Sequence, residues 1–206
     1  MRPAYAYGLL GIGFIMLGAA LVYGLRSPHI SMEPTSAKPA FAVQSPVFEN
    51  GAKIPSKYTC DGDRTLSPPL ALSGIPVGTK ALALVMDDPD VPKARKPDGV
   101  FDHWVVYDIL PPSINEFSSE GGNLEIPEGF PIGSAGLNGA GEPGYTGPCP
   151  PPEYEPSEHR YFFKAFALSK AVHFDNPPTK QELLDAISKH IIAEAELMGR
   201  YKKNTP

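Results

Sequence analysis

Apolar residues in this chain occur in short runs that are separated by proline- and glycine-rich segments. The runs typical of strands cover residues 41–48, 79–86, 101–111 and 159–170. Each is rich in β-branched or aromatic residues and stops at residues that favour turns. Short strands broken by such loops predict a mainly β domain. An antiparallel β-sandwich and an α+β domain with one dominant sheet both fit this pattern.

The pattern changes its period at the C-terminus. Thr179 and Glu182 have the spacing of a capping box, which begins many helices. Apolar residues then recur every three or four positions, as on one face of a helix. They are Leu184, Ile187, Ile191, Ala195 and Met198. We therefore expect a C-terminal α-helix over 179–203, packed on the sheet; an amphipathic helix on a membrane surface is less favoured, because acidic residues occupy its other face.

The N-terminal segment contains 22 consecutive uncharged residues, 4–25, enough to cross a bilayer as a helix. It predicts a transmembrane signal-anchor at 1–26, with a cleaved signal peptide as the alternative. A linker at 27–40 and one domain at 41–203 would follow. In this interpretation the domain is membrane-anchored and extracytoplasmic, or secreted or periplasmic after cleavage.

The chain has two cysteines, Cys60 and Cys149, so only one intramolecular disulfide is possible. An exported domain would permit that bond. Two free thiols are equally compatible with the sequence, which does not give the distance between the Cα atoms.

Composition narrows the class of protein. The 206 residues include 25 prolines and 20 glycines, as expected for a loop-rich globular domain, and the net charge is −5. Nucleic-acid-binding surfaces are usually basic, so we expect no nucleic-acid partner.

Candidate chemistry lies where the predicted strands begin or end. Asp88 and Asp90 belong to an acidic run whose prolines fix the backbone, although an ordinary acidic turn is the simpler interpretation. His103 opens the next strand, where strict alternation would place it on the same face as Val105 and opposite Trp104. Taken alone, a histidine in this position is more often structural than a ligand.

A second histidine begins the strand predicted at 159–170. Alternation places His159 and Tyr161 on one face, next to a loop rich in proline. Two imidazoles and a phenol could donate hydrogen bonds to an anion, and the aspartates could hold the imidazoles in the donor tautomer. An aspartate could also bind the amine of a zwitterionic ligand such as ethanolamine phosphate.

Several motifs together resemble the phosphatidylethanolamine-binding protein family, especially its bacterial and archaeal branch, often called Raf-kinase-inhibitor-like. They are CDGDRTLSPPLALSGIPVGTKALALVMDDPDVP, DHWVVYDI, GLNGAGEPGYTGPCPPP, HRYFFKAFAL and AEAELMGRY. The resemblance implies a large antiparallel sheet packed on a smaller one, a C-terminal helix, and a small pocket for phosphate-like anions or phospholipid headgroups. The ligand-binding residues expected from the motifs and the adjoining backbone are Asp88, Asp90, His103, Gly147, Pro148, Pro150, His159 and Tyr161.

An enzymatic function is not expected. Cys149 with His159 and an aspartate could imitate a nucleophilic triad, but the cysteine is flanked by prolines and lacks neighbouring cations that would activate it. The histidines and acids have no tight metal-ligand spacing, so we expect no metal and no cofactor. The sequence favours a non-catalytic binding module for phosphate-containing small molecules or phospholipid headgroups. The alternative is a protein-interaction module that inhibits a kinase or a protease through the loop 117–145.

Overall fold

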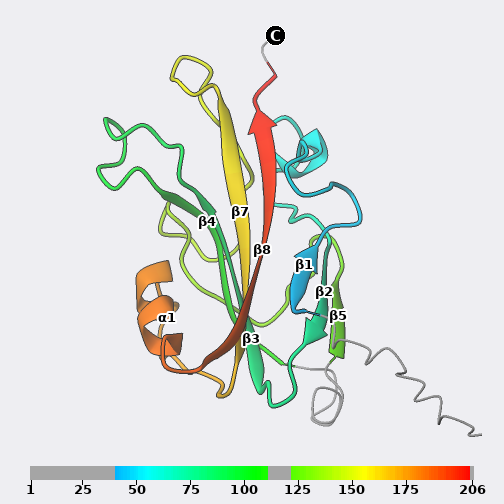
Figure 1. Cartoon of the computed structure of the whole chain (residues 1–206). Helices are drawn as coiled ribbons and strands as arrows, with labels where there is room; N and C mark the ends of the chain where they lie inside the picture. The colour runs from blue at the N-terminus through cyan, green and yellow to red at the C-terminus, as the bar shows by residue number, and fades with distance from the viewer. Residues whose placement is uncertain (1–39, 111–121, 205–206) are drawn as a thin grey trace, which may run out of the picture. The chain divides into compact units, whose positions relative to one another are not determined.

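The computed structural model describes residues 40–110 and 122–204 (Figure 1). These residues form two β-sheets and one α-helix. The elements are β1 (Ala42–Gln44), the 3-10 turn η1 (Ser56–Tyr58), β2 (Leu70–Ile75), β3 (Ala81–Asp88), β4 (Phe101–Ile109), β5 (Gly122–Ile126), β6 (Ser134–Ala135), β7 (Glu158–Leu168), α1 (Lys180–Ile187) and β8 (Ile191–Lys202).

The two sheets are antiparallel and pack face to face. The smaller has the order β1-β2-β5, and the larger has the order β6-β4-β3-β7-β8. Apolar side chains from both sheets form one buried cluster between them, with Leu72, Leu84, Phe163 and Ile54 among its members. Strand β3 lies in the middle of the larger sheet and is buried along its whole length, because it is covered on both faces.

Helix α1 covers the outer face of the larger sheet. Its buried residues Leu183 and Ile187 join a second apolar cluster with Val85 and Val105. The helix begins at Thr179, whose side chain accepts a hydrogen bond from the Glu182 backbone while the Glu182 carboxylate accepts one from the Thr179 backbone. The predicted capping box is therefore present.

The predicted C-terminal helix is wrong beyond its first two turns. Helix α1 ends at Ile187, and residues 191–202 form β8, paired with β7 from Glu158 to Leu168. Helix-forming residues such as Ala, Glu, Leu and Met dominate this segment, but their apolar members also alternate. Ala193, Ala195 and Leu197 face the core between the sheets. Pairing with β7 over the whole strand outweighs the local helix propensity.

The predicted fold class also needs correction at the N-terminus. None of the helices in the described residues is long and apolar enough to cross a membrane. The segment 4–25, on which a transmembrane helix was predicted, lies outside the described residues, as do the signal-anchor 1–26 and nearly all of the linker 27–40. The fold class that the structure supports is mainly β, with two antiparallel sheets and one helix.

The remaining differences concern weakly patterned strands. The strands predicted within 41–48, 79–86, 101–111 and 159–170 correspond to β1, β3, β4 and β7. Strand β2 was missed because it follows a run of turn-forming residues, and the short strands β5 and β6 lie within the glycine-rich segment.

Candidate functional site

Three strand termini meet at one end of the larger sheet, at the top of Figure 1. Because β4, β3 and β7 are antiparallel neighbours, the end of β3 lies beside the beginnings of β4 and β7. Each strand contributes one buried polar residue to the same side of the sheet there: Asp88, His103 and His159. These three residues line a cavity of about 420 Å³.

A β-bulge orients His103 toward this cavity. Met86 pairs with Trp104 and Asp87 pairs with Asp102, so His103 is an extra residue without a partner on β3. The bulge interrupts the alternation of β4. His103 lines the cavity, Trp104 joins the cluster between the sheets and Val105 faces α1. The predicted shared face of His103 and Val105 is therefore wrong, because the prediction assumed a regular strand.

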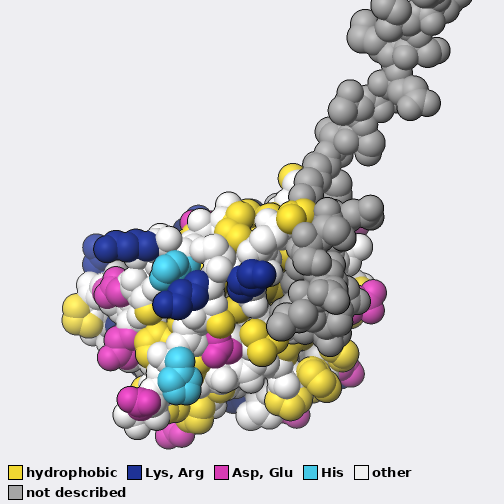
Figure 2. Space-filling view, turned by 90° about the horizontal axis from the view of Figure 1, so that it is seen from below, with side chains coloured by type: hydrophobic (Ala, Val, Ile, Leu, Met, Phe, Trp, Pro, Cys, Tyr) yellow, Lys and Arg dark blue, Asp and Glu magenta, His cyan; other side chains and the backbone are white. Residues whose placement is uncertain are grey.

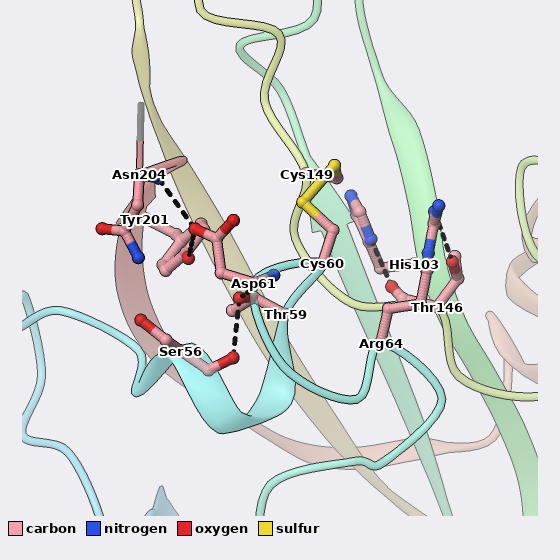
Figure 3. Close-up of a disulfide and its surroundings, with 10 residues drawn as sticks. All are labelled: Ser56, Thr59, Cys60, Asp61, Arg64, His103, Thr146, Cys149, Tyr201 and Asn204. Carbon is pink, nitrogen blue, oxygen red and sulfur yellow. Dashed lines mark hydrogen bonds between the residues drawn. A yellow bond between two sulfur atoms is a disulfide. The ribbon is translucent and has the colours of Figure 1, made fainter. Parts of the chain in front are cut away.

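The protonation of the His103 ring follows from its hydrogen bond. Nδ1 lies 2.5 Å from the Thr146 carbonyl oxygen, which can only accept, so Nδ1 carries a hydrogen (Figure 3). Burial lowers the pKa of His103, against smaller opposing effects of this bond and of Asp88. In the neutral ring, Nε2 therefore has a free lone pair. Its distance from Asp88 Oδ2 is 3.9 Å.

Asp88 is fixed by two contacts. Its Oδ2 lies 2.6 Å from His159 Nδ1, and its Oδ1 accepts a hydrogen bond from the Asp90 backbone at 2.9 Å. The other ring nitrogen of His159, Nε2, is buried and has no hydrogen-bond partner among the residues that the structure describes. Asp88 thus orients His159, as expected for a carboxylate beside an imidazole.

Tyr161 lies behind the cavity and does not line it. Its ring meets that of His103 edge to face, with 5.2 Å between the ring centres. Burial, followed by the nearby Asp88 charge, raises the pKa of Tyr161 well above its usual value, so the phenol stays protonated. The hydroxyl is buried and has no partner within 40–110 and 122–204.

Two further predicted ligand-binding residues lie outside the cavity, as Tyr161 does. Asp90 forms a bidentate ion pair with Arg160, at 2.7 and 2.9 Å, and also accepts a hydrogen bond from the Arg160 backbone. The hydrogen bonds from Arg160 hold the pKa of Asp90 below its usual value. Pro148 does not line the cavity either, and its carbonyl accepts a hydrogen bond from Cys60. Gly147 and Pro150 do line it.

Three cations at the cavity were missed by the sequence analysis. They are Arg64, Arg95 and Lys96, and Asp88 is the one acidic residue among the described lining residues. Arg64 donates to Thr146 Oγ1 at 3.0 Å, and Arg95 lies over the Tyr154 ring. The run KARK at 93–96 could have suggested a basic loop near the acidic turn, but nothing in the sequence indicates that Arg64 reaches the same place.

A disulfide between Cys60 and Cys149 fastens one wall of the cavity. Figure 3 shows it beside Arg64 and His103, which both reach Thr146. Two backbone hydrogen bonds, from Cys60 to the Pro148 carbonyl and from Gly147 to the Arg64 carbonyl, join the same two segments. The proline-rich loop is thus a fixed wall.

The opposite end of the domain has a different character. In Figure 2, which views the molecule from below, acidic, basic and histidine side chains are interspersed with apolar ones. Within 40–110 and 122–204, no three His, Cys, Asp or Glu side chains are placed together so that they could hold a metal ion.

Comparison with known proteins agrees with this fold. Residues 44–202 match the family model described as phosphatidylethanolamine-binding protein, and the chain belongs to this family. It is 43% identical to a UPF0098 protein of Chlamydia trachomatis over 78% of this chain and 97% of the relative. It is 40% identical to a UPF0098 protein of Methanothermobacter thermautotrophicus over 76% and 95% of the two chains.

Two solved structures are similar. One is the crystal structure of a phosphatidylethanolamine-binding protein homologue from Chlamydia trachomatis, with a TM-score of 0.69 and 43% identity; the match covers 80% of this chain and 99% of that one. The other is YbcL from E. coli, with a TM-score of 0.65 and 26% identity, covering 81% and 100%.

Proposed function

We propose that the domain is a non-catalytic binding module whose cavity takes a phosphate-like anion. The observation that carries this proposal is the placement of Arg64, Arg95 and Lys96 around the cavity that contains two buried histidines. A cavity of about 420 Å³ suits a free phosphate or a small phosphorylated headgroup. Three positive charges against the single carboxylate of Asp88 favour an anion over a cation.

Calorimetry with inorganic phosphate and with phosphoethanolamine tests this function directly. The double substitution Arg95→Gln with Lys96→Gln should weaken phosphate binding about tenfold, because each change removes a positive charge from the mouth of the cavity. The matched control is Lys170→Gln with Lys189→Gln, which removes the same charge from exposed positions elsewhere. A wild-type protein that bound neither probe at millimolar concentration would refute the proposal.

The proposal of a binding role rather than catalysis is supported by the state of Cys149. Its sulfur is bonded to Cys60 and therefore offers no thiolate for nucleophilic attack. The disulfide also supports a second proposal, that the domain resides in an oxidising compartment outside the cytoplasm.

A protein-interaction role, such as inhibition of a kinase or protease, is the second candidate. It is favoured by Phe130, which is 53% exposed and borders a hollow of about 210 Å³ with Trp104 and Tyr145. Phe130→Ser should weaken binding to such a partner and leave phosphate binding intact. His159→Ala should have the opposite effect. Equal effects of the two variants on both ligands would contradict two separate surfaces.

A further inference from the structure

The cavity contains hydrogen-bond acceptors where an anion would need donors. The Thr146 carbonyl oxygen can only accept, so the hydrogen of neutral His103 is on Nδ1, and the lone pair of Nε2 points away from Thr146. This Nε2 lies 3.9 Å from Asp88 Oδ2, and both residues line the cavity. Two acceptors therefore face each other across a gap that one ligand oxygen can fill.

His159 carries a further nitrogen beside these two acceptors, its buried Nε2, which has no hydrogen-bond partner among the described residues. When Asp88 and His159 share a single proton, that proton lies in the 2.6 Å contact between Oδ2 and Nδ1, because two lone pairs would repel each other at this distance. Nε2 of His159 is then bare.

We propose that the pocket selects oxyanions that carry their own hydrogen: inorganic phosphate and singly protonated phosphate monoesters, in preference to phosphodiesters and sulfate. A P–OH group placed between Asp88 and His103 can donate to one of the two acceptors, while its charged oxygens meet the cations at the mouth. A diester phosphate has the same charge as the monoester monoanion but no hydrogen, so it leaves these acceptors unpaired. This inference rests on the proposed anion-binding function.

The surroundings of His103 oppose the alternative, in which the ring itself gains a proton. Burial disfavours the charged form of the ring, and the positive charge of Arg64 acts in the same direction. The charged or titratable groups that face His103 are Asp88 on β3, Asp102 on β4, His159 and Tyr161 on β7, Arg64 on the loop after η1, and Arg95 and Lys96 at the mouth.

Two matched pairs of probes test the selection by calorimetry with the full chain. Phosphate and sulfate have the same tetrahedral shape, but at neutral pH only phosphate carries a hydrogen. Phosphoethanolamine and glycerophosphoethanolamine likewise compare a monoester with a diester, and thus a free phosphorylated metabolite with a lipid-type headgroup. At pH 6, where about half of the phosphoethanolamine keeps its P–OH hydrogen, phosphate should bind about tenfold more tightly than sulfate, and phosphoethanolamine about tenfold more tightly than glycerophosphoethanolamine.

The pH dependence of phosphoethanolamine affinity shows whether the hydrogen on the ligand causes the selection. Phosphoethanolamine loses its last P–OH hydrogen with a pKa of about 6. Above that pH its apparent affinity should fall about tenfold per pH unit, because only the protonated fraction binds. Inorganic phosphate keeps one P–OH as the dianion, so its affinity between pH 6 and 8 should change much less.

Asp88→Asn tests the origin of the selection. The asparagine oxygen can still accept from the Asp90 backbone, while its amide replaces the acceptor Oδ2 by a donor. The phosphate-to-sulfate preference should shrink at least about threefold. Asp87→Asn is the matched control, because Asp87 precedes it on β3 and pairs with Lys164 and Lys180 on the other face. In that variant the preference should be unchanged.

The outcomes distinguish the two proposals. Failure of phosphate and phosphoethanolamine to bind at all overturns the proposed function. Equal affinity at pH 6 for phosphate and sulfate, or for the monoester and the diester, overturns the selection and leaves the anion site standing. A phosphoethanolamine affinity that is flat from pH 6 to 8 also overturns it.

Discussion

At the scale of single residues, Gly147 in the cavity wall has no room for a side chain. A Cβ atom at this position would lie 2.5 Å from the Tyr58 carbonyl oxygen, which is backbone and cannot rotate away. Gly147→Ala should therefore cost about 1–3 kcal/mol of stability and shift the wall that Gly147 forms. Phosphate affinity should fall as well, as measured by calorimetry beside urea unfolding.

Gly141→Ala is the comparison for this variant. Gly141 has open space around it and a φ of +82°, so alanine meets only backbone strain of about 1–2 kcal/mol. Its phosphate affinity should match the wild type. Equal loss of affinity in both variants would show that the effect comes from general destabilisation and not from the wall.

Asp90 makes stability depend on pH through its ion pair with Arg160. Hydrogen bonds from Arg160 lower the pKa of Asp90 in the folded state. A lowered pKa means that the stabilisation is fully present above the unfolded-state value, about 3.9, and is lost as pH falls through the folded-state pKa. Asp90→Asn should therefore lower the free energy of unfolding by about 1 kcal/mol at pH 7 and by much less near pH 2.

Urea titrations at the two pH values measure this difference. Asp175→Asn serves as the control, since the Asp175 side chain is 97% exposed. A destabilisation by Asp90→Asn that persisted unchanged at pH 2 would mean that the carboxylate acts through its shape and not through its charge.

Among the site residues, the sequence indicates those that lie at strand termini. Asp88, His103 and His159 are brought together by antiparallel pairing, which the strand pattern anticipates. The strand pattern does not predict the ion pair between Asp90 and Arg160. It describes each segment separately and does not say which side chains of different segments meet. Arg64 is 82 residues from Thr146, and such a contact follows only from the packed loops.

At the scale of elements, β8 shows a conflict between local and long-range preferences. Its Ala- and Glu-rich segment favours a helix by propensity, and the capping box at Thr179 strengthens that impression. The alternation of Ala193, Ala195 and Leu197 was the competing signal. The sequence did not reveal that β7 offers a partner for the whole strand.

Proline substitutions distinguish the strand from a helix. The backbone N–H groups of Met198 and Arg200 point away from β7, toward Asn50 and Ala52, so alternation directs that of Glu194 outward as well. Ala195→Pro should remove a hydrogen bond to β7 and cost about 3 kcal/mol or more. Glu194→Pro should cost clearly less, because proline is tolerated where the N–H faces outward on an edge strand.

Thermal unfolding followed by circular dichroism gives the comparison. In a helix both prolines would be interior and equally disruptive. Similar melting temperatures for the two variants, both far below the wild type, would therefore contradict the assignment of residues 191–202 to a strand.

At the scale of the whole molecule, the disulfide links stability to the shape of the cavity. Cys60 and Cys149 are 89 residues apart in sequence, so their bond restricts the unfolded chain over a long loop. The chain-entropy model gives about 4–5 kcal/mol for a loop of this length. Cys60→Ala with Cys149→Ala should lower the free energy of unfolding by about 2–5 kcal/mol, as measured by urea unfolding.

The same double variant should lose much less free energy of phosphate binding than free energy of unfolding. The hydrogen bonds from Cys60 to Pro148 and from Gly147 to Arg64 use backbone atoms and survive the substitution, so the wall keeps two of its fastenings. We expect phosphate affinity within about threefold of the wild type in the folded variant. Complete loss of binding with the fold intact would show that the sulfur bridge itself shapes the cavity. In the wild type, thiol titration of the unreduced, denatured chain should find no free thiol, since the two cysteines are bonded to each other.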